Sequence, residues 1–290
     1  MVNICLYHGS DIDGICSAAI VKLSNPDTIL IPAEYGIKVK IDDIVSDGDT
    51  VIIVDFVLQP FSEMKRLSEK AHIIWIDHHN TAIEDYNEYI SSGVIEPLNG
   101  VRNVKLSACE LAWNWFNPNI PLPYSVFLLG RYDVWAHGES KSILPFQYGM
   151  KLNHEPPENM EFWKNVFSSP RDSDTIQTII RQGKTIMRYR AKLNEKLCEL
   201  QSFKSSLMGY SCICINRALS GSSIFDSLKN REEYDIMVTF YICSRGAWNV
   251  SMYSIKPEVN VGEIAKLFGG GGHANAAGFR CTILPFEVSP

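Results

Sequence analysis

Acidic and histidine side chains follow three of the short apolar segments in the first eighty residues. They are His8, Asp11 and Asp13 after the first segment, Asp55 after the third, and Asp77, His78 and His79 at the end of the fourth. Alone, an Asp after a strand is more often a turn former or helix cap, and a single His is usually ordinary packing. Together, these groups would repel one another or lie unsatisfied unless cations were bound, so the pattern predicts a metal site.

The ligand types indicate which metals fit. Carboxylate and imidazole without thiolate suit manganese, magnesium or a similar divalent ion better than structural zinc. Asp133, in the sequence GRYDVW, adds a fourth carboxylate to Asp11, Asp13 and Asp55, although alone it would be an ordinary helix-end acid. Four negative charges match two divalent cations, and such a pair about 4 Å apart can activate water and polarise a phosphoryl group. We therefore predict phosphoester hydrolysis.

A glycine run, Gly269–Gly272, precedes His273 near the end of the chain. Glycines let backbone N–H groups approach an anion closely, and the imidazole could donate to a phosphate or a leaving oxygen. No Gly-Lys-Ser/Thr follows, so a nucleoside triphosphate loop is not indicated. A glycine run alone is more often a flexible turn, but with His273 it predicts a substrate-binding loop.

The elements that must position these residues predict an α/β fold in the first 135 residues, because short apolar runs alternate with amphipathic stretches. The predicted strands are Asn3–His8, Thr28–Pro32, Thr50–Phe56 and His72–His78, and the predicted helices are Gly14–Leu23, Phe61–Lys70, Ser107–Phe116 and Tyr124–Gly130. The candidate metal ligands follow the carboxyl ends of these strands. Ligands bind at that edge of an open parallel sheet.

The second half predicts a smaller α/β domain. Prolines between Trp135 and Pro170, Pro145 among them, indicate a linker region, and Asp172–Ser202 predicts one long amphipathic helix. The remaining predictions are strands Ser211–Asn216, Ile236–Cys243, Trp248–Ser254 and Phe279–Leu284, with a short helix Val261–Phe268. The expected division is therefore a catalytic domain at 1–150, a linker at 151–204 and a substrate-binding domain at 205–290.

Composition limits the partners. The 290 residues are 46% hydrophobic and 21% charged, which is typical of a folded protein. A net charge of −6 argues against a protein that coats long nucleic acid, so the expected partner is a short oligonucleotide or small nucleotide. Eight scattered cysteines, no secretory leader and no run of about 18 apolar residues predict a cytoplasmic protein that binds no membrane; a homodimer is allowed.

Two further patterns could serve nucleic acid. The long helix carries a basic face of Arg181, Lys184, Arg188, Lys192 and Lys196, although most such faces are simply solvated. Trp113, Trp115, Trp135, Trp163 and Trp248 could stack on bases, although scattered tryptophans are usually core residues.

The same residues resemble the motifs of the DHH phosphoesterase superfamily, which is named for the triplet that here is Asp77-His78-His79. HGSDIDG, VDF, IDHHN and RYD resemble its four motifs in order, and GGGGHANAAGF resembles the signature of the C-terminal DHH-associated domain in RecJ-type exonucleases and nanoRNases. The match spans nearly the whole chain. It implies a two-lobed enzyme with a manganese pair on an N-terminal parallel-sheet domain, joined by a helical linker to a smaller α/β domain.

By this resemblance, His8, Asp11 and Asp55 hold one metal, while Asp13, the bridging Asp55, His78 and Asp133 hold the other. Manganese is expected, with magnesium or cobalt as alternatives. The catalytic set is Asp55, His79, which would contact the phosphate or protonate the leaving oxygen, and Asp77, which would orient the neighbouring imidazole. Gly270, Gly271, Gly272 and His273 would contact the substrate phosphate.

One departure from the family leaves the substrate open. Many relatives carry Ser-x-Arg-Ser before the glycine run, whereas this chain has Tyr253 in place of the arginine, with Arg245 as a candidate substitute. A manganese-dependent phosphodiesterase acting on short oligonucleotides or linear dinucleotides is the leading hypothesis. A cyclic mono- or dinucleotide, which has no terminal phosphate to hold, is the alternative. A nucleotide-binding regulator with a retired active site is the third hypothesis.

Overall fold

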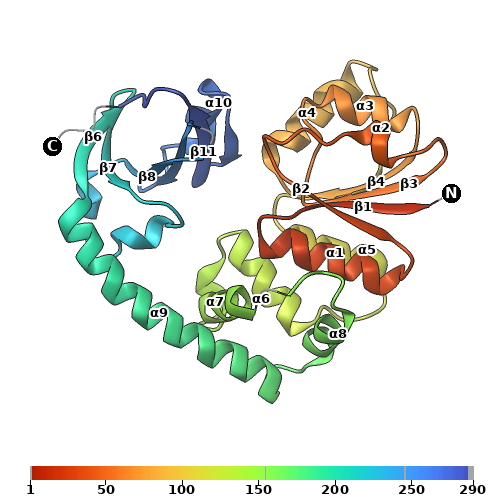
Figure 1. Ribbon diagram of the computed structural model, residues 1–290, viewed down its shortest axis with the longest axis horizontal. Coiled ribbons are helices and arrows are strands. Elements are labelled where there is room, and N and C mark those ends of the chain that lie inside the picture. The colour runs from red at the N-terminus through yellow and green to blue at the C-terminus, as the bar shows by residue number, and fades with distance from the viewer. Residues whose placement is uncertain (1, 154, 245, 287–290) are drawn as a thin grey trace. The chain divides into compact units, whose positions relative to one another are not determined.

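The computed structural model describes residues 2–153, 155–244 and 246–286 (Figure 1). The chain divides into two compact units, Met1–Ile186 and Met187–Pro290. Each unit contains its own sheet, the first wholly parallel and the second mixed. The α/β fold class and the two separate sheets predicted from the sequence are therefore confirmed.

The sheet of the first unit has five parallel strands in the order β2-β1-β3-β4-β5. The strands are β1 (Asn3–His8), β2 (Ile29–Ala33), β3 (Thr50–Val54), β4 (His72–Asp77) and β5 (Asn99–Arg102). β1 lies between β2 and β3, so that Leu6 is opposite Ile31 on one side and Ile53 on the other. The strand order reverses direction at β1, and ligands bind at such a switch point in open α/β sheets.

Helices cover both faces of this sheet. Their bounds are α1 (Ile12–Ser24), α2 (Ile41–Ile44), α3 (Ser62–Ser68), α4 (Asn80–Ser91), α5 (Ala108–Phe116), α6 (Tyr124–Asp133), α7 (Ile143–Asn153) and α8 (Met160–Ser168). α2, α3 and α4 lie on one face, and α1 and α5 on the other (Figure 1). Successive strand residues alternate between the two cores: Ile53 belongs to one cluster, and Ile52 and Val54 to the other. This is the period of two expected for a strand buried on both faces.

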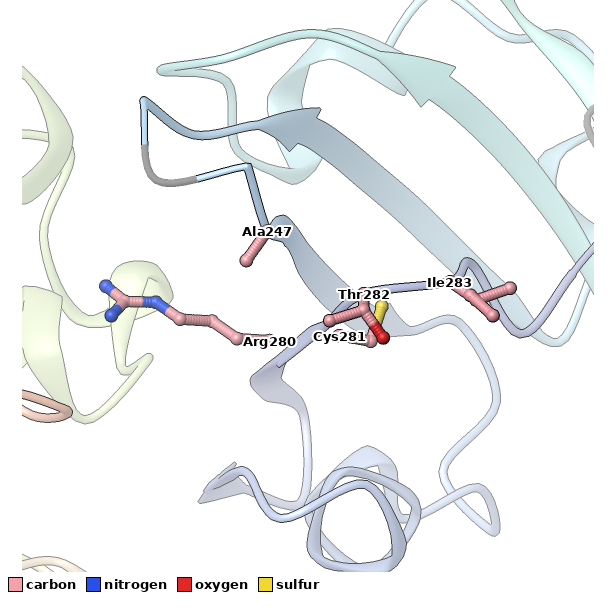
Figure 2. A pocket seen from close by; sticks show the side chains of 5 residues that line it. All are labelled: Ala247, Arg280, Cys281, Thr282 and Ile283. Atoms are coloured by element: carbon pink, nitrogen blue, oxygen red, sulfur yellow. The ribbon is translucent and has the colours of Figure 1, made fainter.

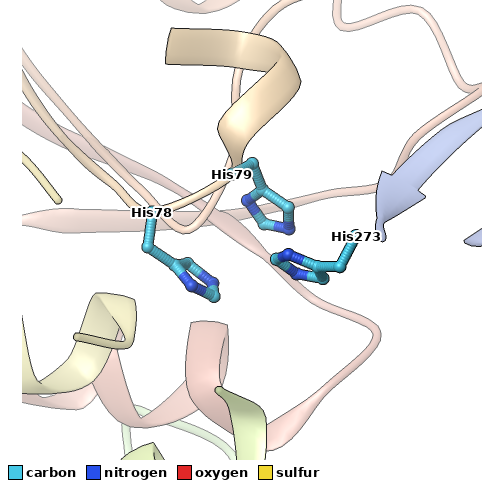
Figure 3. Close-up of side chains that lie close together, drawn as sticks. All are labelled: His78, His79 and His273. Carbon is cyan, nitrogen blue, oxygen red and sulfur yellow. The ribbon is translucent and has the colours of Figure 1, made fainter. Parts of the chain in front are cut away.

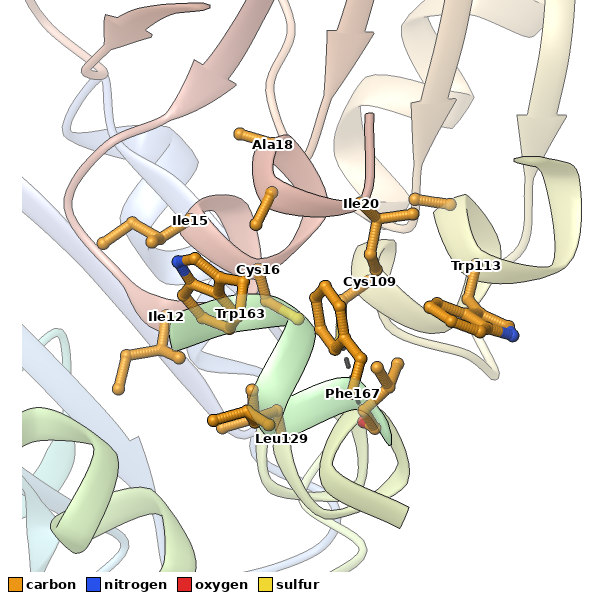
Figure 4. Packing of buried hydrophobic residues seen from close by; sticks show 14 of the residues in the cluster. Ile12, Ile15, Cys16, Ala18, Ile20, Cys109, Trp113, Leu129, Trp163 and Phe167 are labelled. Carbon is orange, nitrogen blue, oxygen red and sulfur yellow. Dashed lines mark hydrogen bonds between the residues drawn. The ribbon is translucent and has the colours of Figure 1, made fainter. Parts of the chain in front are cut away.

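The core beneath α1 and α5 also contains residues from the predicted linker. Trp163 and Phe167 of α8 are buried and pack beside Cys16 of α1 and Cys109 of α5 (Figure 4). The ring centroids of Trp163 and Phe167 are 5.5 Å apart. The prolines between Trp135 and Pro170 do not prevent short helices, because Pro145 lies in the first turn of α7, where a missing N–H costs nothing.

The second unit has a six-stranded mixed sheet in the order β10-β11-β9-β8-β7-β6. Its strands are β6 (Phe203–Leu207), β7 (Tyr210–Asn216), β8 (Ile236–Ile242), β9 (Trp248–Ser254), β10 (Gly271–His273) and β11 (Ala276–Cys281). α10 (Val261–Leu267) packs on one face of this sheet, and the short 3₁₀ turn η2 (Ser222–Phe225) packs on the other. Two further 3₁₀ turns are η1 (His137–Glu139) in the first unit and η3 (Arg231–Glu233) in the second. The predicted last strand, Phe279–Leu284, is displaced because Ala276–Gly278 already pair with β9 and β10.

A single helix, α9 (Asp174–Gln201), passes from one unit into the other. Its early residues Ile176, Ile179 and Ile180 are buried in the core of the first unit. Its later residue Cys198 is buried in the second unit. The predicted linker 151–204 thus contributes residues to both units, and its assignment as a separate segment stays a prediction.

Within the described ranges, none of the helices combines the length of a membrane span with a sufficiently apolar composition. All eight cysteines are free thiols, and six of them are buried.

Candidate active site

The carboxyl ends of β1, β3 and β4 bring the predicted acidic and histidine residues of the first unit together. His8 ends β1, Asp55 follows β3 and Asp77 ends β4. Asp13 lies in the first turn of α1, and Asp133 is the last residue of α6. Two groups of side chains each place their ligand atoms within 4.8 Å of one another: His8, Asp11 and Asp55 form one, and Asp13, His78 and Asp133 form the other.

In the first group, His8 lies between two carboxylates. Its Nδ1 is 3.0 Å from Asp11 Oδ2 and 3.6 Å from Asp55 Oδ2. Burial alone would lower the pKa of His8, but the carboxylates of Asp11 and Asp55 raise it to about 11. Asp11 also caps α1, because its Oδ1 accepts the N–H of Gly14 at 3.0 Å. Asp11 is therefore a helix cap and also a member of this group of possible ligands.

Asp55 belongs to the first group and also lies close to the second, because its Oδ1 is 3.2 Å from Nε2 of His78. It is 1% exposed, and its backbone has the left-handed φ of +55°, which few residues other than Gly, Asn and Asp adopt readily. Burial raises the pKa of its carboxyl, but the neighbouring imidazoles of His78 and His8 lower it below its usual range. Neither carboxylate oxygen has a hydrogen-bond partner of good geometry among the described residues. A buried carboxylate so placed requires positive charge nearby.

The DHH triplet turns from β4 into α4. Figure 3 shows the imidazoles of His78 and His79 at this turn; His273, from β10, is also labelled. His78 is buried, with its Nε2 3.2 Å from both Asp55 Oδ1 and Asp133 Oδ2. Burial alone would lower the pKa of His78, but Asp55 and the other carboxylates raise it to about 10.

Asp77 holds the triplet in place through one oxygen. Its Oδ1 accepts the backbone N–H of His78 at 2.7 Å and that of His79 at 3.2 Å, and it lies 2.8 Å from Nδ1 of His79. Burial alone would lower the pKa of His79, but Asp77 and Asp55 raise it to about 9. The expectation that Asp77 orients a neighbouring imidazole matches this geometry, and that imidazole is His79.

Asp13 is held by the N-terminus of α5. Its two oxygens accept the backbone N–H groups of Ala108 and Cys109, each at 2.9 Å. These are two of the amide groups that a helix leaves without an internal partner, and they favour a negative charge. Burial and the carboxylates of Asp55 and Asp133 act in the opposite direction and raise the pKa of Asp13. Burial likewise raises the pKa of Asp133 to about 7.

An ion pair joins α5, whose N-terminus binds the carboxylate of Asp13, to α6, which carries Asp133. Ser107 caps α5 in a capping box with Glu110, and Arg131 of α6 donates from Nη2 to Oε2 of Glu110. Gly130 allows the close approach, because a Cβ there would lie 2.5 Å from Ser107 Oγ. This contact therefore links the helix that binds Asp13 to the helix that carries Asp133. Sequence reasoning missed it, although the S-x-x-E pattern before an apolar run signals the capping box.

Tyr35 is a second residue that sequence reasoning missed. It follows β2, and its ring centroid lies 5.4 Å from that of His8, 4.9 Å from that of Phe56 and 6.0 Å from that of His79. Burial raises the pKa of its hydroxyl. Nothing in the local sequence marks this tyrosine, because its position depends on the order of the strands.

In the second unit, the glycine run is largely explained by backbone geometry. Gly272 has a φ of +139°, and a Cβ on Gly270 would lie 2.1 Å from the carbonyl oxygen of Gly278. A Cβ on Gly271 would meet no atom within 4 Å, so packing does not require glycine there. His273 ends β10 beside it. Packing and backbone conformation therefore explain the glycines at 270 and 272 but not the glycine at 271.

The remaining predicted substrate contacts are Tyr253 and Arg245. Tyr253 lies in β9, largely buried, and burial raises the pKa of its hydroxyl despite its hydrogen bonds with Thr239 and Ser251. Arg245 lies outside the described residues. An open hollow of about 420 Å³ lies elsewhere in this unit, lined by Ala247, Arg280, Cys281, Thr282 and Ile283 (Figure 2). None of these five belongs to the predicted site.

Comparison with known proteins assigns the family. The model of the DHH family N-terminal domain matches residues 2–128, and that of the DHHA1 domain matches residues 218–283. The chain therefore belongs to the DHH phosphoesterase family and carries a C-terminal DHHA1 domain. Members of this family are divalent-metal-dependent phosphoesterases, which places the chain in a family of hydrolases.

Individual relatives are distant but cover nearly the whole chain. Uncharacterized protein R106 of Acanthamoeba polyphaga mimivirus is 24% identical, over 99% of this chain and 70% of that protein. Oligoribonuclease NrnB of Bacillus subtilis is 23% identical, over 98% of this chain and 74% of that protein. The structure of the pGpG-specific phosphodiesterase PggH of Vibrio cholerae has a TM-score of 0.50 at 13% identity, over 98% of this chain and 94% of that one. This last similarity shows the fold.

Proposed function

We propose that the protein is a manganese-dependent phosphodiesterase that hydrolyses short oligonucleotides or linear dinucleotides to mononucleotides. The observation that carries the proposal is the pair of ligand groups meeting at Asp55, at the carboxyl ends of β1, β3 and β4. Two similar proteins, an oligoribonuclease and a pGpG-specific phosphodiesterase, act on nucleotides, and this supports a nucleotide substrate. Location in the cytoplasm stays a prediction.

The residues fit two divalent ions. Among the residues that the structure describes, neither buried oxygen of Asp55 has a hydrogen-bond donor of good geometry, which suits a carboxylate shared by two cations. His8, Asp11 and Asp55 would hold one ion, and Asp13, Asp55, His78 and Asp133 the other. The oxygen and imidazole donors suit manganese, with magnesium or cobalt as alternatives. When bound, the ions would supply positive charge that polarises the phosphoryl group and acidifies a water.

His79, which lies next to the predicted metal ligands, would hold and donate a proton. Because Nδ1 of His79 bonds to Asp77, we assign Nε2 as the atom that donates to the leaving oxygen or to the phosphate. Asp77 fixes the ring orientation and stabilises the protonated imidazole. In the second unit, we assign phosphate contact to the backbone of Gly270, Gly271 and Gly272 and to the side chain of His273.

A cyclic nucleotide is the second candidate substrate. Tyr253 supplies no fixed charge on β9 where many relatives have arginine. A substrate without a terminal phosphate needs no such charge. The retired-site hypothesis is disfavoured, because a module without catalysis has no physical need for four converging carboxylates.

Turnover across one matched panel tests the proposal. The panel contains linear dinucleotides, five-nucleotide RNA and DNA, cyclic mono- and dinucleotides, phosphoadenosine phosphate and pyrophosphate, each with manganese. Preference for the short linear substrates is expected, preference for a cyclic nucleotide would favour the second candidate, and silence would favour the regulator.

The matched variant for this test is Asp55→Asn. Asn tolerates the φ of +55° and keeps the shape of the side chain, but it removes the shared charge. We expect turnover to be nearly abolished while circular dichroism stays unchanged. An active Asp55→Asn protein would contradict the two-metal mechanism.

A further inference from the structure

Three aromatic rings lie at the C-terminal end of α6 and in the turn that follows it, beside the candidate ligand Asp133. The ring centroids of Tyr132 and His137 are 5.1 Å apart with an interplanar angle of 23°, and those of Trp135 and His137 are 5.4 Å apart at 26°. His137 is therefore stacked between the other two rings. Backbone hydrogen bonds from the N–H of Trp135 to the carbonyl of Tyr132, at 3.1 Å, and from Ala136 to Arg131, at 2.9 Å, hold the turn.

Trp135 is the exposed end of this stack. It is 41% exposed, whereas Trp113 and Trp163 are buried in the core. One face of its indole lies against His137, and it makes no second ring contact within the described part of the chain. At the other end of the stack, the Lys151 ammonium lies 5.4 Å from the centroid of the Tyr132 ring. The arrangement presents one large aromatic face, supported from behind by two rings and a cation.

The backbone at Trp135 is unfavourable for a residue of this kind. Its φ is +61°, a left-handed conformation that a bulky side chain rarely adopts and that Gly or Asn would adopt at less cost. Such conformations persist where the surrounding structure enforces them, and they concentrate at functional sites. The backbone conformation and the exposure of Trp135 therefore mark it as a candidate for a functional role.

We propose that the indole of Trp135 stacks on a nucleobase of the substrate, next to the phosphate that is cleaved. This inference rests on the proposed phosphodiesterase function. Trp135 is two residues after Asp133, so their Cα atoms are at most about 7.6 Å apart, which a single nucleotide can span. Stacking tolerates any base, because every base has an aromatic face. The site would therefore recognise nucleotides without selecting a particular sequence.

The variants Trp135→Gly and Trp135→Phe test the proposal with intact and abasic dinucleotides. Gly removes the ring and relieves the positive φ, so the variant should fold at least as well as the wild type. We expect KM for the intact dinucleotide to rise about 5- to 100-fold with kcat little changed, and Phe to restore much of the loss. Removing the stacked base from the substrate should raise the wild-type KM similarly and leave Trp135→Gly unaffected.

Tyr210→Ala is the matched control, because Tyr210 is a comparably exposed aromatic residue, at 36%, at the start of β7. An unchanged KM for Trp135→Gly, or equal sensitivity of Trp135→Gly and wild type to base removal, would overturn the proposal.

If the wild type cleaves nothing in the panel, the proposed function fails separately. Calorimetric binding of the dinucleotide to wild type and Trp135→Gly then decides: weaker binding by the variant supports the stacking site, whereas equal binding or none overturns it.

Discussion

Asp13 and Asp133 belong to the same candidate metal site, yet their replacement by Asn should affect stability differently. Both carboxylates are buried beside other acids, so neutralising either one relieves an unfavourable charge in the metal-free protein. Only Asp13, however, accepts two backbone N–H groups at 2.9 Å, those of Ala108 and Cys109. An Asn side chain has one acceptor oxygen and would turn its NH₂ group toward one of these donors.

The size of the difference follows from that lost bond. A hydrogen bond to a charged group contributes about 1.5–3 kcal/mol, and leaving a buried N–H unsatisfied costs about 1–3 kcal/mol. Because these costs overlap, we expect Asp13→Asn to be about 3 kcal/mol less stable than Asp133→Asn. At about 2–4 °C per kcal/mol for a unit of this size, the Tm values should differ by roughly 6–12 °C.

The pH dependence of stability shows whether Asp133→Asn should be more or less stable than the wild type. Burial raises its folded pKa from 3.8 to about 7, so the wild type binds an extra proton when folded and loses stability as the pH rises from 4 to above 7. Asp133→Asn should therefore gain on the wild type across that interval, on the order of 1–3 kcal/mol, and match it below pH 4. Thermal unfolding in EDTA at pH 4 and pH 7.5 measures both effects. Equal Tm values for the two variants, or a lower one for Asp133→Asn, would refute the reasoning.

Two further predictions concern the second unit. Asp235 accepts hydrogen bonds from Ser211 and Lys256, which lower its pKa from 3.8 to about 2. This stabilisation is present above pH 4 and lost as the pH falls towards 2, so Asp235→Asn should destabilise the protein by about 1–2 kcal/mol in urea at pH 7, after allowance for solvent screening, and not at pH 2. In the glycine run, Gly270→Ala should lower Tm, because its Cβ would meet backbone at 2.1 Å, whereas Gly271→Ala should leave Tm unchanged and raise KM. A lowered Tm for Gly271→Ala would contradict the conclusion that packing does not require glycine at this position.

The fold class and the convergence of the site residues could be read from the sequence because both depend on strand periodicity. Side chains at the carboxyl ends of parallel strands must meet at one edge, so Asp55 and His78 could be placed together without knowing the strand order. The helix α4 was missed although Ala82, Tyr86, Tyr89 and Ile90 form an apolar stripe on it, and β5 was missed because it is short and contains Gly100. Helices α7 and α8 were missed because the prolines near them indicated a linker region.

The supporting residues could not be placed from the sequence. Tyr35 reaches His8 and His79 only because β2 is an edge strand beside β1, and strand order is not encoded locally. The contact of Arg131 with Glu110 joins two helices whose packing depends on Gly130. Trp135 was one of five candidate tryptophans, and only its exposure and backbone conformation distinguish it.

The continuity of α9 has a practical consequence for fragments of this protein. The division between the units falls between Ile186 and Met187, in the interior of a helix that runs to Gln201. A cut there would leave carbonyl groups on one fragment and N–H groups on the other without their helical partners, and it would shorten a cooperative element. Fragments that duplicate α9 should therefore express better than fragments that divide it, and a protease that nicks the helix would weaken both halves of the chain at once.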